Sequence, residues 1–181
     1  MAQKRKDWNG LISGFKASDL VFLDESGCNT DMTRRYADSL GGSRAVDSAP
    51  LSKPKNTTIL PSIQLDGTLR YTTFSGGTTV ERFKRYLETD LLPHLNGNSV
   101  LIMDNMKSHH AKAVRNLLDS SGVRYIYLPP YSPDLNPIEK LWSKVKSFLR
   151  KFKARTLDAL PNAIQNAFHS VTISDCSGWG R

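Results

Sequence analysis

Cysteine and long apolar runs are scarce in this chain, and their scarcity excludes several classes of protein. The two cysteines, Cys28 and Cys176, stand alone and far apart among 181 residues. They fit neither a disulfide framework nor a zinc site, and they favour a reducing compartment. No apolar run approaches the roughly 18 residues that a membrane-spanning helix needs, and the basic start at residues 1–8 lacks the apolar stretch of a secretory signal. The 12 glycines and 9 prolines are too few for a linker or a fibrous chain.

Acidic residues are outnumbered by basic ones. The chain has 25 lysines and arginines against 17 acids, which gives a net charge of +8 and a pI near 9.6. This balance favours a polyanionic partner, with nucleic acid as the first candidate. Hydrophobic residues make 39% and charged residues 23% of the chain, as in globular proteins. Because a chain of this length buries about 70% of its unfolded surface, we expect one domain with its own core.

The hydrophobic pattern predicts a mixed α/β sheet covered by helices. Asp66-Gly67 is typical of a hairpin turn, because glycine tolerates positive φ. Thr78 and Glu81 have the spacing of a capping box at the start of a helix that Pro93 should end. The expected strands lie at 20–23, 57–65, 69–74, 100–103 and 123–128. The expected helices run from about Thr78 to Pro93, from about Ser108 to Gly122, from about Pro137 onward, and over 157–171.

Two aspartates directly follow apolar strands of this predicted sheet. Asp24 follows the run at 20–23, and Asp104 follows the run at 100–103, so each is expected at or near the carboxyl end of a strand. In an open α/β sheet, functional sites gather at the carboxyl ends of strands. If the two strands are neighbours, the carboxylates converge, and two nearby anions repel unless a cation lies between them. Their hard oxygens suit Mg²⁺ or Mn²⁺. The structural alternative is that each aspartate only starts a loop or caps a helix.

Glu139 is the third candidate carboxylate. Asn136 can cap the helix that follows, and Pro137 suits its first position, so Glu139 falls at the third. That spacing is itself a capping box, which leaves a purely structural role open.

Three segments resemble a known family. They are Leu-Asp-Glu-Ser-Gly at 23–27, Met-Asp-Asn at 103–105 with His109, and Leu-Pro-Pro-Tyr-Ser-Pro-Asp-Leu-Asn-Pro-Ile-Glu at 128–139. They are similar to the catalytic motifs of mariner-like insertion-sequence transposases, within the DDE transposase and integrase superfamily. The 34 residues between Asp104 and Glu139 match the spacing of that family. The similarity extends from about residue 18 to residue 179.

The resemblance implies an RNase H-like fold, with a five-stranded mixed sheet flanked by helices. It also implies that Asp24, Asp104 and Glu139 form a catalytic triad that binds two Mg²⁺ or Mn²⁺ ions. The implied activity is cleavage of double-stranded DNA at the ends of a mobile element and joining to target DNA, by a homodimer in the active complex. A cytoplasmic, nucleoid-associated protein is expected.

The family pattern also predicts how the chain is divided. We expect a basic lead-in over 1–17, the catalytic domain over 18–175 with an irregular excursion at 26–55, and a short tail over 176–181. The lead-in is too short for the helix-turn-helix modules of the family, so a separately encoded chain is a possible source of them. The alternative function is a catalytically inactive DNA-binding remnant or inhibitor. A housekeeping RNase H-like nuclease is disfavoured by the proline-rich segment before Glu139.

Candidate DNA-binding residues lie in two places. Arg34 and Arg35, in the excursion, can grip DNA or belong to a solvated loop, while His109 matches a family histidine and can contact metal-bound water or DNA, cap a helix or lie on the surface. The segment 140–155 has seven basic residues and no acid. At about 100° per residue, three of these basic residues fall on the same helix flank as Glu139. They are Lys146, Arg150 and Lys153. A solvated basic face is the alternative.

Overall fold

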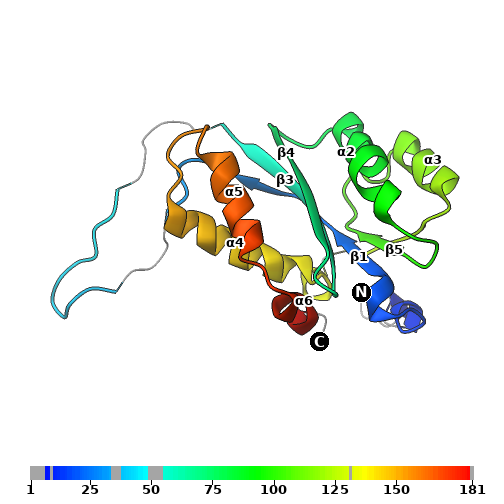
Figure 1. Cartoon of the computed structure of the whole chain (residues 1–181), viewed down its shortest axis with the longest axis horizontal. Helices are drawn as coiled ribbons and strands as arrows, with labels where there is room; N and C mark the ends of the chain where they lie inside the picture. The colour runs from blue at the N-terminus through cyan, green and yellow to red at the C-terminus, as the bar shows by residue number, and fades with distance from the viewer. Residues whose placement is uncertain (1–6, 9, 34–37, 49–54, 131, 180–181) are drawn as a thin grey trace.

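The structure is a computed structural model that describes residues 7–8, 10–33, 38–48, 55–130 and 132–179 (Figure 1). Arg34 and Arg35, predicted to contact DNA, lie outside these residues.

The core of the fold is one mixed sheet. β1 pairs in parallel with β5, and β5 in parallel with β6, whereas β3 is antiparallel to β1, β2 and β4. The sheet has six strands, and its order from β2 is β2-β3-β1-β5-β6, with β4 on β3. The strands are β1 (Leu20–Leu23), β2 (Ser26–Cys28), β3 (Thr57–Gln64), β4 (Leu69–Ser75), β5 (Val100–Met103) and β6 (Arg124–Tyr127).

The sixth strand arises from a short break after β1. β4 pairs with β3 from Thr57 to Ile63 and so occupies one edge of it. β1 and β2 pair with β3 at different heights, at Ser62–Gln64 and at Thr57–Ile59, and therefore share the other edge. The sheet thus has five positions across its width, as expected, and the pair Asp24-Glu25 interrupts one of them. The first three residues of the predicted irregular excursion belong to β2.

Helices cover both faces of the sheet. Alternate side chains of β1 enter two separate cores, with Leu20 and Phe22 on one face and Val21 and Leu23 on the other. The first core includes α4 (Ile138–Phe152), α5 (Leu160–His169) and α6 (Ile173–Trp179), and the second includes α2 (Val80–Tyr86) and α3 (Lys112–Ser121). Figure 1 shows these two groups on opposite sides of the sheet. Within the described residues, no helix is both long and apolar enough to cross a membrane.

The predicted turns are confirmed where glycine is needed. Gly67 has φ +98° in the β3–β4 turn, and a Cβ there would approach Ile173 Cγ1 to 2.7 Å. Gly122 has φ +71° and ends α3. Both positions therefore need glycine's access to positive φ.

Helix starts were predicted less well than helix ends. The cap of α2 is Thr79, whose side chain accepts a hydrogen bond from the Arg82 amide, so the prediction of Thr78 was one residue early. α2 continues as a π-helical turn, η2 (Leu87–Leu91), and a 3₁₀ turn, η3 (Leu92–His94), which contains Pro93. α3 begins at Lys112, not near Ser108, because the preceding residues form separate turns. α6 was not predicted.

Candidate active site

The two strand-end aspartates lie at the same edge of the sheet. β1 and β5 are neighbours, and Leu23 is paired with Met103 in their parallel register. Asp24 and Asp104 are the next residue of each strand, so both leave the sheet at its carboxyl edge. The expected adjacency of the two strands is confirmed.

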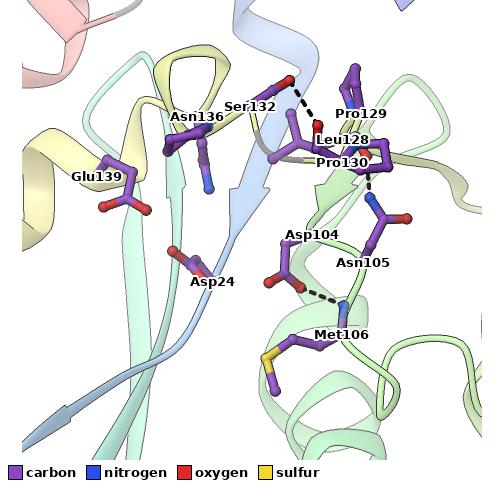
Figure 2. Close-up of a pocket in the computed structure, with 11 residues that line it drawn as sticks. Asp24, Asp104, Asn105, Met106, Leu128, Pro129, Pro130, Ser132, Asn136 and Glu139 are labelled. Atoms are coloured by element: carbon purple, nitrogen blue, oxygen red, sulfur yellow. Dashed lines mark hydrogen bonds between the residues drawn. The ribbon is translucent and has the colours of Figure 1, made fainter. Parts of the chain in front are cut away.

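A cavity of about 430 Å³ opens at this edge. Asp24 and Asp104 line it together with Glu139, which lies in the first turn of α4. In Figure 2 the Glu139 carboxylate is directed toward Asp24, which lies between Glu139 and Asp104. The opposite wall of the cavity is formed by residues 128–130, 132, 133 and 136. The three predicted acids therefore reach one cavity from two strands and one helix.

Asp24 carries its negative charge in an unfavourable environment. Burial, together with the smaller effects of the charges of Asp104 and Glu139, raises its pKa to about 6. Two hydrogen bonds oppose the shift: the Glu25 amide donates to Oδ1 at 2.7 Å, and Trp142 Nε1 donates to Oδ2 at 3.3 Å. An anion is thus held in a site where its charge is unfavourable unless a cation binds.

Trp142 links the helix to this aspartate. It lies three residues after Glu139 on α4, so one helical turn presents one acid and orients another. Its ring is 4% exposed and also carries the Lys146 ammonium, 5.7 Å from the ring centroid. A tryptophan on the buried face of a helix gives no separate sequence signal of a hydrogen bond to Asp24.

His109 holds the second aspartate. Its Nδ1 lies 2.8 Å from Asp104 Oδ1, and its Nε2 lies 3.5 Å from Glu25 Oε2, an ion-pair distance without hydrogen-bond geometry. The ring is 0% exposed and stacks on Phe83 at 4.1 Å between centroids. Burial lowers the pKa of His109, but the two acids outweigh it and raise the pKa to about 9. Burial raises the pKa of Asp104, and the hydrogen bond and charge of His109 bring it below its usual value.

The position of His109 does not fit the predicted contact with DNA. A fully buried ring between two acids has no surface for a phosphate or a groove. His109 belongs instead to the support of Asp104, and Glu25, which sequence reasoning did not single out, is part of the same support.

Asn105 and His110 brace the opposite wall. The Asn105 amide group donates to the Leu128 carbonyl, and its Oδ1 lies 3.3 Å from His110 Nε2. His110 stacks on Tyr127 at 4.0 Å, and the Tyr127 hydroxyl donates to the His109 carbonyl at 3.0 Å. Both ends of Asn105 are therefore engaged within the protein.

The capping box predicted for Glu139 does not form. The Asn136 amide, which Glu139 would have to accept, donates to the Pro133 carbonyl at 3.0 Å in the turn η4 (Pro133–Leu135). Asn136 does cap: its Oδ1 accepts from the Ile138 amide at 3.4 Å. Glu139 is exposed to the cavity, and its carboxylate makes no hydrogen bond to any other described residue. The structure thus gives Glu139 no part in capping its own helix.

The acids share a cavity without closing on a common point. Among the described residues, no three histidine, cysteine, aspartate or glutamate side chains form a group that could hold a metal ion. The donor set itself fits a hard divalent ion, since it consists of carboxylate oxygens around a cavity.

The basic row predicted on α4 is shorter than expected. Lys146 and Arg150 lie on the helix and are half-buried. Lys153 lies beyond the last helical residue, with φ +53°, so the helical projection does not extend to it. Its Nζ lies 2.6 Å from Asp47 Oδ1. Lys153 therefore ties the excursion to the body, and its predicted place in a DNA-facing row is corrected.

Three carboxylates at strand and helix ends around one cavity are the donor set of enzymes that transfer phosphoryl groups with divalent ions. Residues 19–161 match the family model described as DDE superfamily endonuclease. The chain belongs to the DDE superfamily of endonucleases.

The chain is also similar to transposases. It is 30% identical over 97 residues to the transposable element Tc1 transposase of Caenorhabditis elegans, covering 51% of this chain and 36% of that protein. It is 29% identical over 75 residues to the Tcb2 transposase of Caenorhabditis briggsae, covering 41% of this chain and 28% of that protein. The chain thus spans about a third of the length of these curated relatives.

Solved structures confirm the fold. The Mos1 transposase in a paired-end complex with the left transposon end has a TM-score of 0.81 and 19% identity, covering 97% of this chain and 56% of that one. The catalytic domain of Mos1 mariner transposase has a TM-score of 0.68 and 17% identity, covering 98% of this chain and 84% of that one. The expected RNase H-like α/β fold is therefore the fold of this chain.

Proposed function

We propose that this chain is the catalytic domain of a transposase that cleaves DNA at the ends of a mobile element and joins those ends to target DNA. The observation that carries the proposal is the meeting of Asp24, Asp104 and Glu139 at one cavity, within a fold shared with Mos1 transposase. The relatives that are similar in sequence are transposases as well.

The three carboxylates would hold Mg²⁺ or Mn²⁺, and we propose two ions. Asp104 supports metal binding, because its Oδ1 accepts from the Met106 amide and faces His109, which leaves Oδ2 without a partner among the described residues. Solved Mos1 complexes contain Mg or Mn. Ions bound here supply activation of a water or 3′-hydroxyl and charge stabilisation at the phosphate.

The other residues of the site keep the carboxylates in place. Trp142 and the Glu25 amide fix the two oxygens of Asp24, and His109 fixes one oxygen of Asp104. Neither aspartate can turn away from the cavity without losing these bonds. The pair of acids is thus oriented by the fold before any ligand binds.

The proposed partner is double-stranded DNA, at the element ends and at the target. The net charge of +8 supports a polyanionic ligand. Mos1 forms paired-end complexes with transposon ends, and we propose a homodimer in the active complex here also. Helix-turn-helix modules encoded separately would supply sequence-specific binding. We place the protein in the cytoplasm, on the nucleoid.

A nicking assay tests the activity. In Mn²⁺, the chain should cut a labelled duplex that carries an element end, and Asp24→Asn should abolish cleavage while leaving the fold intact. The matched control is Asp158→Asn, because Asp158 is exposed between α4 and α5. DNA binding without cleavage in either Mg²⁺ or Mn²⁺ would support the inactive remnant instead, and preferred cleavage of RNA–DNA hybrids would support a housekeeping nuclease.

Arg150 tests the proposed path of DNA along α4. Arg150→Ala should weaken binding of all duplexes similarly and lower the slope of log K against log salt by about 0.9 for each lost phosphate contact. Lys144→Ala is the comparison, because the Lys144 ammonium is paired with Asp175 of α6. An equal change of slope in both variants would mean that α4 carries only a solvated basic face.

A further inference from the structure

We infer that Asn136 is a catalytic residue of this site, and that its amide group donates a hydrogen bond to the phosphodiester that is cleaved. This inference rests on the proposed function and names a substrate contact within it. The residue lines the same cavity as the three carboxylates and is 5% exposed.

The orientation of the Asn136 side chain is fixed by its own helix. The Ile138 amide donates at 3.4 Å, so the atom that faces it must be the carboxamide oxygen. The NH₂ group must then point the other way. In Figure 2 the nitrogen is directed into the space above Asp24, between Glu139 and Asp104. It has no hydrogen-bond partner among the residues that the structure describes.

The chemistry of this group selects its ligand. An amide nitrogen is a donor and cannot serve as a ligand for a hard cation, which takes oxygen. Asn136 therefore offers the cavity only donors, beside carboxylates that offer only acceptors. The ligand that accepts hydrogen bonds while lying against metal-binding carboxylates is an anionic oxygen, and in a DNA-cleaving site it belongs to the phosphodiester. A donor aimed at charge that develops in the transition state is a common catalytic device.

The second asparagine at the site provides a contrast. Asn105 also lines the cavity, but its amide group is bonded to the Leu128 carbonyl and its oxygen lies near His110 Nε2. Its donors are used inside the protein, so it braces the wall. Asn136 uses only its acceptor internally, which leaves its donors for substrate.

Two substitutions separate the donor from the cap. Asn136→Asp keeps the size of the side chain and an oxygen for the Ile138 amide, but it replaces the donor with an anion. Asn136→Ser is neutral and can still accept from that amide, but it cannot reach as far into the cavity. The control is Asn162→Asp on α5, because Asn162 is exposed and uses its Oδ1 as an acceptor from Asn166 at 2.7 Å. It carries the same change of charge and keeps its bond.

The experiment measures three quantities on the whole chain: Mn²⁺ affinity by calorimetry, duplex affinity in Mn²⁺, and the single-turnover rate of cleavage. Asn136→Ser should keep Mn²⁺ affinity within about twofold, weaken duplex binding about tenfold, and slow cleavage on the order of 100-fold. Asn136→Asp should bind Mn²⁺ as well or better and bind duplex worse than Asn136→Ser. Asn162→Asp should match the unaltered chain.

A phosphorothioate at the scissile position sharpens the assignment. Sulfur accepts hydrogen bonds weakly, so one phosphorothioate stereoisomer should be cleaved more slowly than ordinary DNA by the unaltered chain. Asn136→Ser, which lacks the donor, should cleave that stereoisomer and ordinary DNA at similar rates.

Two results would overturn the inference. Unchanged duplex affinity in Asn136→Ser would leave Asn136 as a helix cap alone. A large loss of Mn²⁺ affinity in the same variant would make it part of the metal site. Failure of the proposed function gives a different result, because the unaltered chain then cuts no DNA. The effect of Asn136→Ser on duplex affinity still shows in that case whether Asn136 contacts the DNA backbone.

Discussion

Asp24 and Asp104 have equivalent positions in the sheet and opposite electrostatic environments. Each is the first residue after one of two paired parallel strands. Burial and two neighbouring carboxylates raise the pKa of Asp24 to about 6, whereas His109 holds the pKa of Asp104 below its usual value. The backbone thus places the two acids alike, and the side chains around them decide their charge. The anionic form of Asp104 is stabilised within the protein, whereas the negative charge of Asp24 stays unfavourable until a cation enters the cavity.

Removing the charge of Asp104 should have the largest effect on stability. Asp104→Asn removes the negative charge beside the fully buried His109, whose remaining anionic neighbour is Glu25 at 3.5 Å. We expect the free energy of unfolding at pH 7 to fall by about 2–3 kcal/mol. Urea denaturation without metal measures the loss. A change below 0.5 kcal/mol would show that the charge of Asp104 is not needed to hold His109.

The equivalent change at Asp24 should have the opposite sign. Asp24→Asn removes an unfavourable buried charge. A pKa near 6 against an ordinary value near 4 corresponds to at most about 3 kcal/mol, and partial exposure reduces the expected gain to about 1–2 kcal/mol. The variant should therefore be more stable than the unaltered chain at pH 8 without metal, although we expect it not to cleave DNA.

The pH dependence of that gain follows from the raised pKa. In the unaltered chain, Asp24 is protonated in both the folded and unfolded states below about pH 4, so it imposes no penalty there. The unfolded state loses its proton first as pH rises, and the penalty grows until the folded group ionises near pH 6. The stability difference between the two proteins should thus increase from pH 4 to pH 7 and then remain constant. A difference that shrinks over this window contradicts the raised pKa.

Trp142 should have a smaller effect through the same aspartate. Trp142→Phe keeps an aromatic ring in the core and removes the donor to Asp24 Oδ2. We expect a loss of about 0.5–1.5 kcal/mol above pH 6 and a further rise in the pKa of Asp24. Carboxyl chemical shifts followed through a pH titration measure that pKa directly, and no movement would mean that the indole does not orient the aspartate.

Glu139 should have the smallest effect on stability. Its carboxylate is exposed to the cavity and forms no capping box. Glu139→Gln is expected to change the free energy of unfolding by less than about 0.5 kcal/mol, as for most surface substitutions. A loss of 1 kcal/mol or more in thermal or urea denaturation would restore the capping role.

The acids of the candidate site could be singled out from the sequence because they follow features that depend on neighbouring residues alone, and the family resemblance grouped them as a triad. Asp24 and Asp104 end short apolar runs, and Glu139 follows a proline and a helix cap. The hairpin turn at Gly67 and the helix end at Gly122 were equally accessible, because each needs positive φ. These signals require no knowledge of what packs against them.

The support of the site could not be predicted in this way. The bond from Trp142 to Asp24 joins residues 118 positions apart, and the contact of His109 with Glu25 joins two loops. Lys153 was expected to continue a helical row, but the helix ends one residue earlier and Lys153 forms an ion pair with Asp47. Such contacts depend on tertiary packing, so the spacing of residues along the sequence does not predict them.

Crystals of the chain with duplex DNA and Mn²⁺ test the central claim most directly. Anomalous scattering locates each Mn²⁺ independently of the protein. The account predicts Mn²⁺ bound by Asp24, Asp104 and Glu139, with oxygen distances near 2.1 Å. Ordered carboxylates that remain more than about 8 Å apart with DNA in place, too far for ions shared between them, and with no Mn²⁺ among them, would contradict it.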